Sequence, residues 1–341
     1  MIESTLVTPQ PTQEDHAVDK SLRPSSLDDF VGQTELVANL RVYIEAARRR
    51  ETPLDHVLLF GPPGLGKTTL AHIIAGELST GIKFSSGPVI DRPADLAGIL
   101  TNLAERDVFF IDEIHRMSST VEEYLYAAME DFRIDIMLDK GPNSRSVQLS
   151  LHPFTLIGAT TRMGNLTSPL RDRFGVTLRL DFYSAPELKQ IILRSAELLE
   201  IPVNDAAAEV IGMRSRGTPR IANRILRRAR DFAEVDGRGL LDRPTAEKAL
   251  LRLGIDELGL DEMDRRILSL LVNNFGGGPV GVETMAVALH ETARTIEEVY
   301  EPYLIKQGFL ERTPRGRAAT ARTYDYLNVK PGSAPLQRPL F

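Results

Sequence analysis

A short apolar run followed by a glycine-rich loop decides the fold of this chain: residues 56–68 read HVLLFGPPGLGKT. Residues 61–68 match G-x4-G-K-[ST], follow an expected buried strand and open a helix expected over residues 68–78, the setting that a phosphate-binding loop requires. The glycines let backbone N–H groups converge on phosphate oxygens, and the helix N-terminus adds its positive dipole end. We therefore expect Lys67 to reach the β- and γ-phosphates of a nucleotide, and the Thr68 hydroxyl to ligate Mg²⁺.

Two acidic residues supply the expected second half of this site. Residues 107–111 (DVFFI) form another apolar run, which leads directly into Asp112 and Glu113. The carboxyl ends of parallel strands are where α/β folds bind ligands. Such a pair alone is weak, because acids also follow strands at helix N-termini. After a complete phosphate loop, however, Asp112 is the candidate for holding Mg²⁺ and Glu113 the candidate for polarising the attacking water.

Three further residues are ambiguous when read from their positions alone. A third apolar run, residues 154–159, ends beside Thr161, whose hydroxyl either contacts the γ-phosphate or reflects ordinary strand propensity. Arg173 and Arg220 are candidates for stabilising a transferring phosphoryl group, from the same chain or from a neighbour. Composition alone favours solvated surface charges for both arginines.

The alternation of apolar strands with amphipathic helices indicates a parallel sheet covered on both faces. Strands stop after residue 183, and helices are expected over 185–199, 205–214, 219–234 and 245–253. Helices over 262–272, 282–289 and 295–307 follow, and then two strand candidates at 309–312 and 320–326. This order is that of a winged helix. We therefore predict tails at 1–21 and 331–341, an ATPase domain over 22–183 with a hairpin insertion at about 130–151, a small helical domain over 184–254 and a winged helix over 255–330.

Composition excludes several classes of protein. The 341 residues include no cysteine, which rules out a disulfide scaffold, a thiol nucleophile and any Cys-based metal site. No run approaches about 18 apolar residues, so we expect no membrane span. The polar N-terminus lacks the apolar region of a secretory signal, and we expect a cytoplasmic protein. The net charge of −6 argues against a chain that coats nucleic acid over its whole surface, but not against a local basic site.

A predicted β-hairpin is the first of two candidate binding surfaces outside the phosphate site. Apolar residues Ile134, Ile136 and Leu138 alternate with polar ones before a turn at residues 141–144, and alternation resumes at 147–151, the pattern of a β-hairpin. The hairpin either packs on its own core or protrudes as an interface.

Basic residues gather at the C-terminal end. From residue 306 to 341 the chain has seven basic residues against two acidic ones. Arg312, Arg315 and Arg317 fall on the predicted wing, where guanidinium groups can reach DNA phosphates. A charged, solvated hairpin is the alternative.

With these residues in view, the chain resembles the AAA+ ATPases, and among them the bacterial motors of Holliday-junction branch migration. The resemblance covers roughly residues 20–327. The carrying stretches are LRP at 22, FVGQ at 30, GPPGLGKTTLA at 61, FIDEIHR at 110, LIGATTR at 156, TSPLRDRFG at 167, GTPRIANR at 217 and EPYLIKQGFLERTPRGR at 301. The first of these are shared by all AAA+ proteins, and the last two are far more specific.

The resemblance implies an α/β AAA+ P-loop core with a parallel sheet, then a small helical lid domain and a C-terminal winged helix. It also implies roles in ATP or ADP and Mg²⁺ binding. The nucleotide side comprises Leu22, Arg23, Gly64, Gly66, Lys67, Thr68, Thr69, Glu130, Asp131, Phe132 and Tyr183. Asp112 and Glu113 match the Walker B pair, Thr161 sensor 1, Arg220 sensor 2 and Arg173 the finger that acts on a neighbouring subunit's ATP. Thr68 and Asp112 are the implied metal residues.

The family further implies a homohexameric ring around duplex DNA, with Arg312 and Arg317 at its DNA-contacting positions. It implies that the hairpin with Ile134, Ile136 and Leu138 docks on a junction-binding partner protein. Two alternatives remain: an AAA+ initiator or clamp-loader-like switch that hydrolyses ATP slowly, and a non-catalytic winged-helix regulator. The intact Lys67 and Glu113 argue against the regulator.

Overall fold

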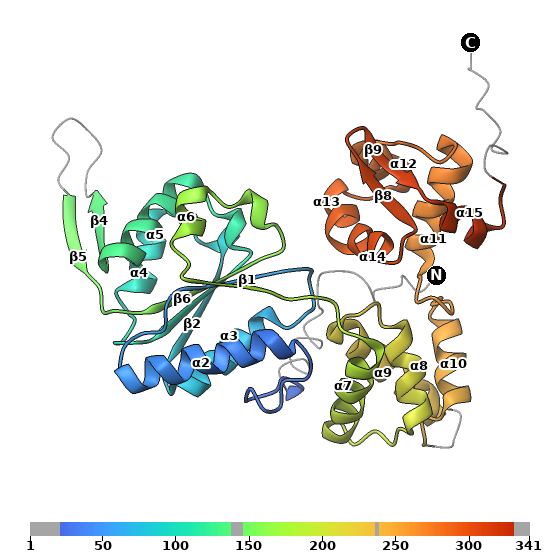
Figure 1. Cartoon of the computed structure of the whole chain (residues 1–341), viewed down its shortest axis with the longest axis horizontal. Helices are drawn as coiled ribbons and strands as arrows, with labels where there is room; N and C mark the ends of the chain where they lie inside the picture. The colour runs from blue at the N-terminus through green and yellow to red at the C-terminus, as the bar shows by residue number, and fades with distance from the viewer. Residues whose placement is uncertain (1–20, 138–145, 236–238, 331–341) are drawn as a thin grey trace, which may run out of the picture. The chain divides into compact units, whose positions relative to one another are not determined.

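The computed structural model describes residues 21–137, 146–235 and 239–330. These residues form two compact units (Figure 1). One comprises residues 23–61 and 65–181, and the other contains residues 21–22, residues 62–64 and everything described from residue 182 onward. The predicted tails fall almost wholly outside the described residues, and the predicted domain boundaries stay predictions.

The first unit is built on a five-stranded parallel sheet. Its strands are β1 (Val57–Phe60), β2 (Ile82–Ser86), β3 (Val108–Asp112), β6 (Thr155–Thr160) and β7 (Val176–Arg179), in the order β2-β3-β6-β1-β7. The three middle strands are almost entirely buried, as expected when helices cover both faces of a parallel sheet. Figure 1 shows α2 (Thr34–Arg50) and α3 (Lys67–Leu78) on one face, and α4 (Pro93–Leu100) and α5 (Ser119–Asp131) on the other. The short α6 (Ser168–Asp172) precedes β7.

A two-stranded antiparallel hairpin follows α5, as the alternating pattern predicts. Its strands are β4 (Arg133–Met137) and β5 (Ser146–Ser150), and Ile134 pairs with Leu149. Ile134 is fully buried and belongs to the core cluster that includes Phe154. The Ile134 side chain therefore packs inward in the subunit, and its predicted contact with a partner protein stays a prediction. The side chain of Ile136 and all of Leu138 lie outside what the structure describes.

The helices of the second unit begin with α7 (Ala185–Leu198), α8 (Asp205–Arg214), α9 (Pro219–Val235) and α10 (Arg243–Arg252). The winged helix follows with α11 (Glu262–Ser269), α12 (Val282–Leu289), α13 (Ala293–Thr295) and α14 (Glu301–Lys306). Turns at Leu270–Asn274 and Ile296–Tyr300 are π-helical and continue α11 and α13.

The wing itself differs from its predicted bounds. Its strands are β8 (Leu310–Thr313) and β9 (Gly316–Ala319), and Val280 pairs with Arg317 on the outer side of β9. Residues 320–326 were expected as a strand, but they lie mainly in α15 (Ala321–Leu327). Thr323 is buried, and Tyr326 packs edge-on against Phe309 with ring centroids 5.5 Å apart. Residues three apart share a helix face, so this packing outweighs the strand propensity of threonine and tyrosine.

Candidate nucleotide-binding site

The phosphate loop has the backbone shape that only glycine permits. Gly61 has φ +146°, and a Cβ there would lie 2.4 Å from the carbonyl oxygen of Leu180. Gly66 has φ +99° and directly precedes α3. The loop therefore bends sharply between β1 and α3, and the first N–H groups of α3 face the loop.

Lys67 is placed as a phosphate-binding residue requires. The side chain is almost fully buried, with 7% of the residue exposed, and its Nζ donates a hydrogen bond to the carbonyl oxygen of Gly61 at 2.8 Å. An ammonium group buried in this way needs polar partners, because desolvation disfavours the charged form. The loop that surrounds Lys67 supplies one such partner, and this contact keeps the ammonium group at the loop.

Strand order brings the other catalytic candidates to the same edge. β6 lies between β1 and β3, and the register pairs Phe60 with Thr160 and Ile111 with Gly158. The strands are parallel, so their carboxyl ends meet beside the phosphate loop. Asp112 is the last residue of β3, and its Oδ1 accepts a hydrogen bond from the Glu113 N–H at 2.9 Å.

Thr161 leaves the end of β6 between the phosphate loop and the acidic pair. Its Oγ1 is buried and has no hydrogen-bond partner among the residues that the structure describes. A buried hydroxyl without a partner costs free energy, so it is typical of a group that awaits a ligand. The oxygen-rich set of Thr68, Asp112 and Thr161 fits Mg²⁺ with a nucleotide phosphate, since Mg²⁺ prefers oxygen ligands and usually shares them with phosphates.

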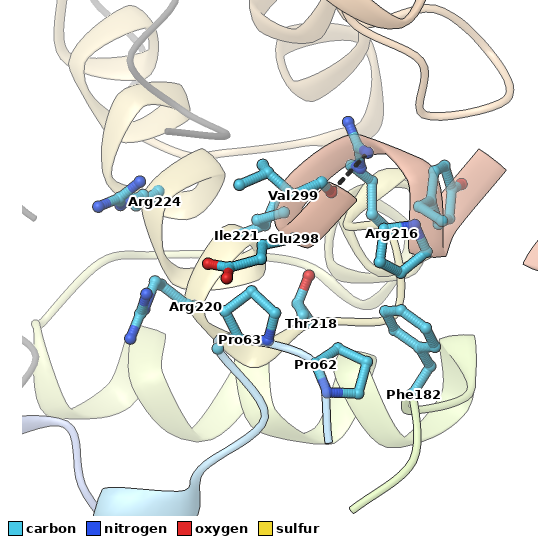
Figure 2. A pocket seen from close by; sticks show the side chains of 13 residues that line it. Pro62, Pro63, Phe182, Arg216, Thr218, Arg220, Ile221, Arg224, Glu298 and Val299 are labelled. Carbon is cyan, nitrogen blue, oxygen red and sulfur yellow. Dashed lines mark hydrogen bonds between the residues drawn. The ribbon is translucent and has the colours of Figure 1, made fainter. Parts of the chain in front are cut away.

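The second unit carries the remaining nucleotide-side candidates. Arg220 lies in the first turn of α9, and its N–H is 3.5 Å from the Gly64 carbonyl oxygen. Gly64 has φ +82°, and a Cβ there would lie 3.2 Å from the Arg220 Cβ. Figure 2 shows Pro62 and Pro63 beside Thr218 and Arg220 in one pocket. The predicted sensor arginine thus lies next to this part of the phosphate loop.

Two further predicted residues belong to the same unit. Leu22 is buried, and its carbonyl oxygen accepts a hydrogen bond from Arg194 at 2.9 Å. Tyr183 is also buried, and its N–H donates to the carbonyl oxygen of Gly217 at 2.9 Å. Arg23 is assigned to the other unit.

Arg173 forms a separate group with α5. Its Nη2 donates to the Tyr126 hydroxyl at 2.6 Å and lies 2.7 Å from Glu130 Oε2. The guanidinium carbon stands 4.7 Å from the centre of the Tyr126 ring, a cation–π contact. Tyr126 was not among the functional residues predicted from the sequence. The available signal was spacing, because Tyr126 and Glu130 are four residues apart and share a helix face.

Asp131 and Phe132 end α5. Asp131 Oδ2 accepts a hydrogen bond from Arg133 at 2.8 Å, and both side chains are exposed. Phe132 packs edge-on against Phe154, with ring centroids 5.8 Å apart. Phe132 is thus held by aromatic packing at the start of the hairpin. The predicted nucleotide roles of these two residues stay predictions.

The predicted DNA contacts on the wing are in different surroundings. Arg317 is buried, with Nε 3.0 Å from Glu301 Oε2 and Nη2 2.7 Å from Glu297 Oε1. Arg312 is more exposed, and its Nη2 lies 3.0 Å from the same Glu297 oxygen. Arg315 is exposed at the wing turn. The wing thus offers Arg315 and Arg312 to solvent, whereas Arg317 joins the wing to the helix beneath it.

Fold and site together define a class of protein. A phosphate loop after β1, acids at the end of β3 and a polar residue after β6, followed by a helical lid and a winged helix, are the parts of an AAA+ P-loop ATPase. Three family models match the chain: the Holliday junction DNA helicase RuvB P-loop domain at residues 22–180, the RuvB AAA lid domain at 183–256 and the RuvB C-terminal winged helix domain at 257–328. The chain belongs to the RuvB family.

Relatives and solved structures agree with this assignment. The Holliday junction branch migration complex subunit RuvB of Myxococcus xanthus is 59% identical over 322 residues, which is 94% of each chain. The corresponding subunit of Salinibacter ruber is 58% identical over 316 residues, 93% of this chain and 92% of that one. The Thermotoga maritima RuvB Holliday junction branch migration motor is 51% identical, with a TM-score of 0.84 over 91% of this chain and 99% of that chain. No helix in the described ranges is both long and apolar enough to cross a bilayer.

Proposed function

We propose that this chain is an ATP-driven motor subunit that moves duplex DNA and thereby drives branch migration of Holliday junctions. The observation that carries the proposal is the placement of Lys67, Asp112, Glu113 and Thr161 at the carboxyl edge of one sheet, where the buried Thr161 hydroxyl has no hydrogen-bond partner among the described residues. Phosphoryl transfer requires positioned charges and a positioned water more than covalent chemistry, and these side chains supply both. The chain's relatives carry the name of branch migration subunits.

Each residue has a defined task in ATP hydrolysis. Lys67 binds the β- and γ-phosphates, and Thr68 and Asp112 would hold Mg²⁺, which neutralises charge on the phosphates when bound. Glu113 orients and polarises the attacking water, and Thr161 holds the γ-phosphate or that water. Thr69, Gly64 and Gly66 complete the cradle, while Leu22, Arg23 and Tyr183 hold the adenine side. Arg220 contacts the bound nucleotide and thereby couples its hydrolysis to the position of the helical lid domain.

The reaction centre is completed by a neighbouring subunit. Arg173 is held by Tyr126 and Glu130 of its own subunit, and we propose that it acts on the nucleotide of the neighbouring subunit. A finger supplied by a neighbour requires a ring, and we propose a homohexamer around duplex DNA. Glu130, Asp131 and Phe132, which lie at the end of α5 near Arg173, are proposed as further nucleotide-binding residues.

The winged helix is the proposed DNA-binding part. Exposed guanidinium groups on Arg312 and Arg315 can bind phosphates without reading sequence, as a motor that moves along any DNA requires. RuvA and RuvC are the proposed partner proteins, and the hairpin around Ile136 and Leu138 is the proposed RuvA contact. A protein that acts on chromosomal DNA in bacteria works in the cytoplasm.

The test is unwinding of a synthetic four-way junction by the full chain with RuvA, Mg²⁺ and ATP, together with phosphate release. The proposal predicts that DNA raises ATP turnover and that branch migration dissociates the junction into two duplexes. ATP binding with slow turnover and no unwinding would favour the initiator or clamp-loader-like switch. No ATP hydrolysis at all would leave the winged-helix regulator.

A further inference from the structure

A buried histidine lies between the proposed catalytic glutamate and the end of β6. His115 sits in the short 3-10 turn Ile114–Arg116, directly after Glu113, and its side chain is 4% exposed. Its Nε2 is 3.6 Å from Glu113 Oε2. On the other side of the ring, Nδ1 is 2.9 Å from the Thr160 hydroxyl oxygen. The ring therefore spans the space between β6 and the glutamate.

The neighbours of His115 indicate whether the ring nitrogen that faces Glu113, Nε2, carries a hydrogen. Thr160 Oγ1 already accepts a hydrogen bond from the Arg162 N–H at 2.9 Å, and its own hydrogen is free to go to His115 Nδ1. A neutral ring that accepts at Nδ1 carries its hydrogen on Nε2, and a protonated ring carries one there as well. In the remaining neutral tautomer, the hydrogen is on Nδ1 and the lone pair of Nε2 points toward the Glu113 carboxylate. That arrangement is unfavourable because the lone pair and the carboxylate repel each other. Glu113 therefore faces an N–H group.

Thr160 also belongs to the phosphate loop's own support. It is fully buried, and its carbonyl oxygen accepts a hydrogen bond from the Gly61 N–H at 3.2 Å. Its neighbour Thr161 carries the buried hydroxyl that has no hydrogen-bond partner within the described part of the chain. At the end of β6, Thr161 is thus the residue available to the nucleotide, and Thr160 contacts the histidine that lies beside Glu113.

We propose that His115 and Thr160 are positioning residues that hold the Glu113 carboxylate in register with the phosphate loop and with Thr161. This inference rests on the proposed ATPase function and deepens it. Thr160 ends β6 and Thr161 directly follows it, so a displacement of this strand end by a bound nucleotide would reach Glu113 through the His115 ring. The contact of 3.6 Å closes to a hydrogen bond when the carboxylate turns toward its working position.

The experiment compares Thr160→Val with Thr160→Ser in the full chain, in the presence of duplex DNA, Mg²⁺ and ATP. Valine keeps the shape but removes the hydroxyl, whereas serine keeps the hydroxyl. We expect Thr160→Val to lower kcat about 10- to 100-fold, because a misplaced catalytic group loses about that much, with binding of a fluorescent ATP analogue changed less than about twofold. Thr160→Ser should restore most of kcat.

A matched control lies at the other end of the same strand. Thr155 is equally buried, and its hydroxyl donates to the Leu54 carbonyl oxygen at 2.8 Å. Thr155→Val removes a comparable hydrogen bond far from Glu113 along β6, so kcat should stay near wild type. A second control combines Thr160→Val with Glu113→Gln. This double variant should hydrolyse ATP no more slowly than Glu113→Gln alone, because both substitutions disable the same catalytic unit.

An unchanged kcat in Thr160→Val overturns the proposal, as does a loss that adds fully to that of Glu113→Gln. Should Thr160→Val fail to fold, His115→Gln carries the same test with the same two readouts. Failure of both variants to fold would assign the pair to the core alone. A wild-type chain that hydrolyses no ATP contradicts the proposed function instead, so the two failures are distinguishable.

Discussion

The guanidinium of Arg173 donates to the hydroxyl of Tyr126 at 2.6 Å and stacks 4.7 Å from the centre of its ring. An arginine tail has many rotamers, and fixing it on an aromatic ring reduces what must be ordered when the residue meets its target. The structure thus presents the proposed finger in a fixed place on its own subunit. The exposure of Arg173 leaves it accessible to another molecule.

Tyr126 is expected to affect turnover without binding nucleotide itself. Tyr126→Phe removes the hydrogen bond but keeps the ring, so kcat should fall a few-fold, whereas Tyr126→Ala should lower it about tenfold, because it also removes the cation–π contact. Steady-state ATPase assays with DNA present measure this order. Tyr124 is a control aromatic residue on the same helix, and Tyr124→Phe should turn over normally. Equal activity of wild type and Tyr126→Ala would show that the contact does not matter.

Lys67→Ala should abolish ATP binding. The ammonium group at the Gly61 carbonyl is the charge that meets the phosphates, and methyl cannot replace it. Titration of a fluorescent ATP analogue measures the affinity, which we expect to fall by at least about 100-fold. Lys83, on β2 at a mostly exposed position, provides the control Lys83→Ala. Retained affinity in Lys67→Ala would refute the assignment of the phosphate loop.

Arg315 and Arg317 should respond differently to removal. Arg315→Ala should weaken duplex DNA binding and lower the slope of log affinity against log salt by about one, because one phosphate contact is lost. Arg317→Ala removes the buried guanidinium that pairs with Glu297 and Glu301, while the more exposed Arg312 still pairs with both, so it should lower the thermal unfolding temperature of the winged helix. Fluorescence anisotropy at several salt concentrations and thermal unfolding separate the two. A lower salt slope in Arg317→Ala at unchanged stability would make that residue a direct DNA contact after all.

His56 predicts a loss of stability in acid. Its Nδ1 accepts a hydrogen bond from the Leu156 N–H at 2.9 Å, and its Nε2 is 3.2 Å from the Met129 carbonyl oxygen, so the ring is neutral with its hydrogen on Nε2. Burial lowers the pKa of His56 from its ordinary value of 6.5. The unfolded chain therefore binds the proton more readily than the folded chain, and the free energy of unfolding falls as the pH drops below about 6.5.

Urea denaturation of the full chain between pH 5 and pH 8 measures this dependence. The slope for this one group should approach about 1.4 kcal/mol per pH unit at most. His56→Gln should flatten the curve below pH 6.5, while His290→Asn, at an exposed helix end with φ +56°, should leave it unchanged. The same slope in His56→Gln as in wild type would remove His56 from the account.

Local chemistry explains what the sequence predicted correctly. The loop at residues 61–68 is set by neighbours in the chain, and the parallel strands end at one edge, so the placement of Lys67 and Asp112 at the same edge of the sheet follows from the pattern. Ile134 illustrates what the alternating pattern cannot predict. Alternation divides a hairpin into two faces but does not say which face meets the core, and α5 packs on β4 from the side of Ile134.

Side-chain partnerships are harder to read from sequence than strands. Arg317 resembles any basic residue of a wing until the fold brings Glu297 and Glu301 to it from the preceding helical turn. Similarly, His115 follows the acidic pair, and the motif points to a function for the acids only. Thr160 is 45 residues further along the chain and contacts His115 because β6 lies next to β3 in the sheet. Such contacts depend on tertiary approach, which periodicity does not encode.

The most direct test of a shared reaction centre is ATP hydrolysis by mixtures of Arg173→Ala and Lys67→Ala subunits on duplex DNA. Each variant alone should be inactive. In an equal mixture, about one site in four pairs an intact phosphate loop with a neighbour's intact finger, so turnover should reappear at about that fraction of wild type. A mixture as inactive as its components, although it assembles, would contradict the account.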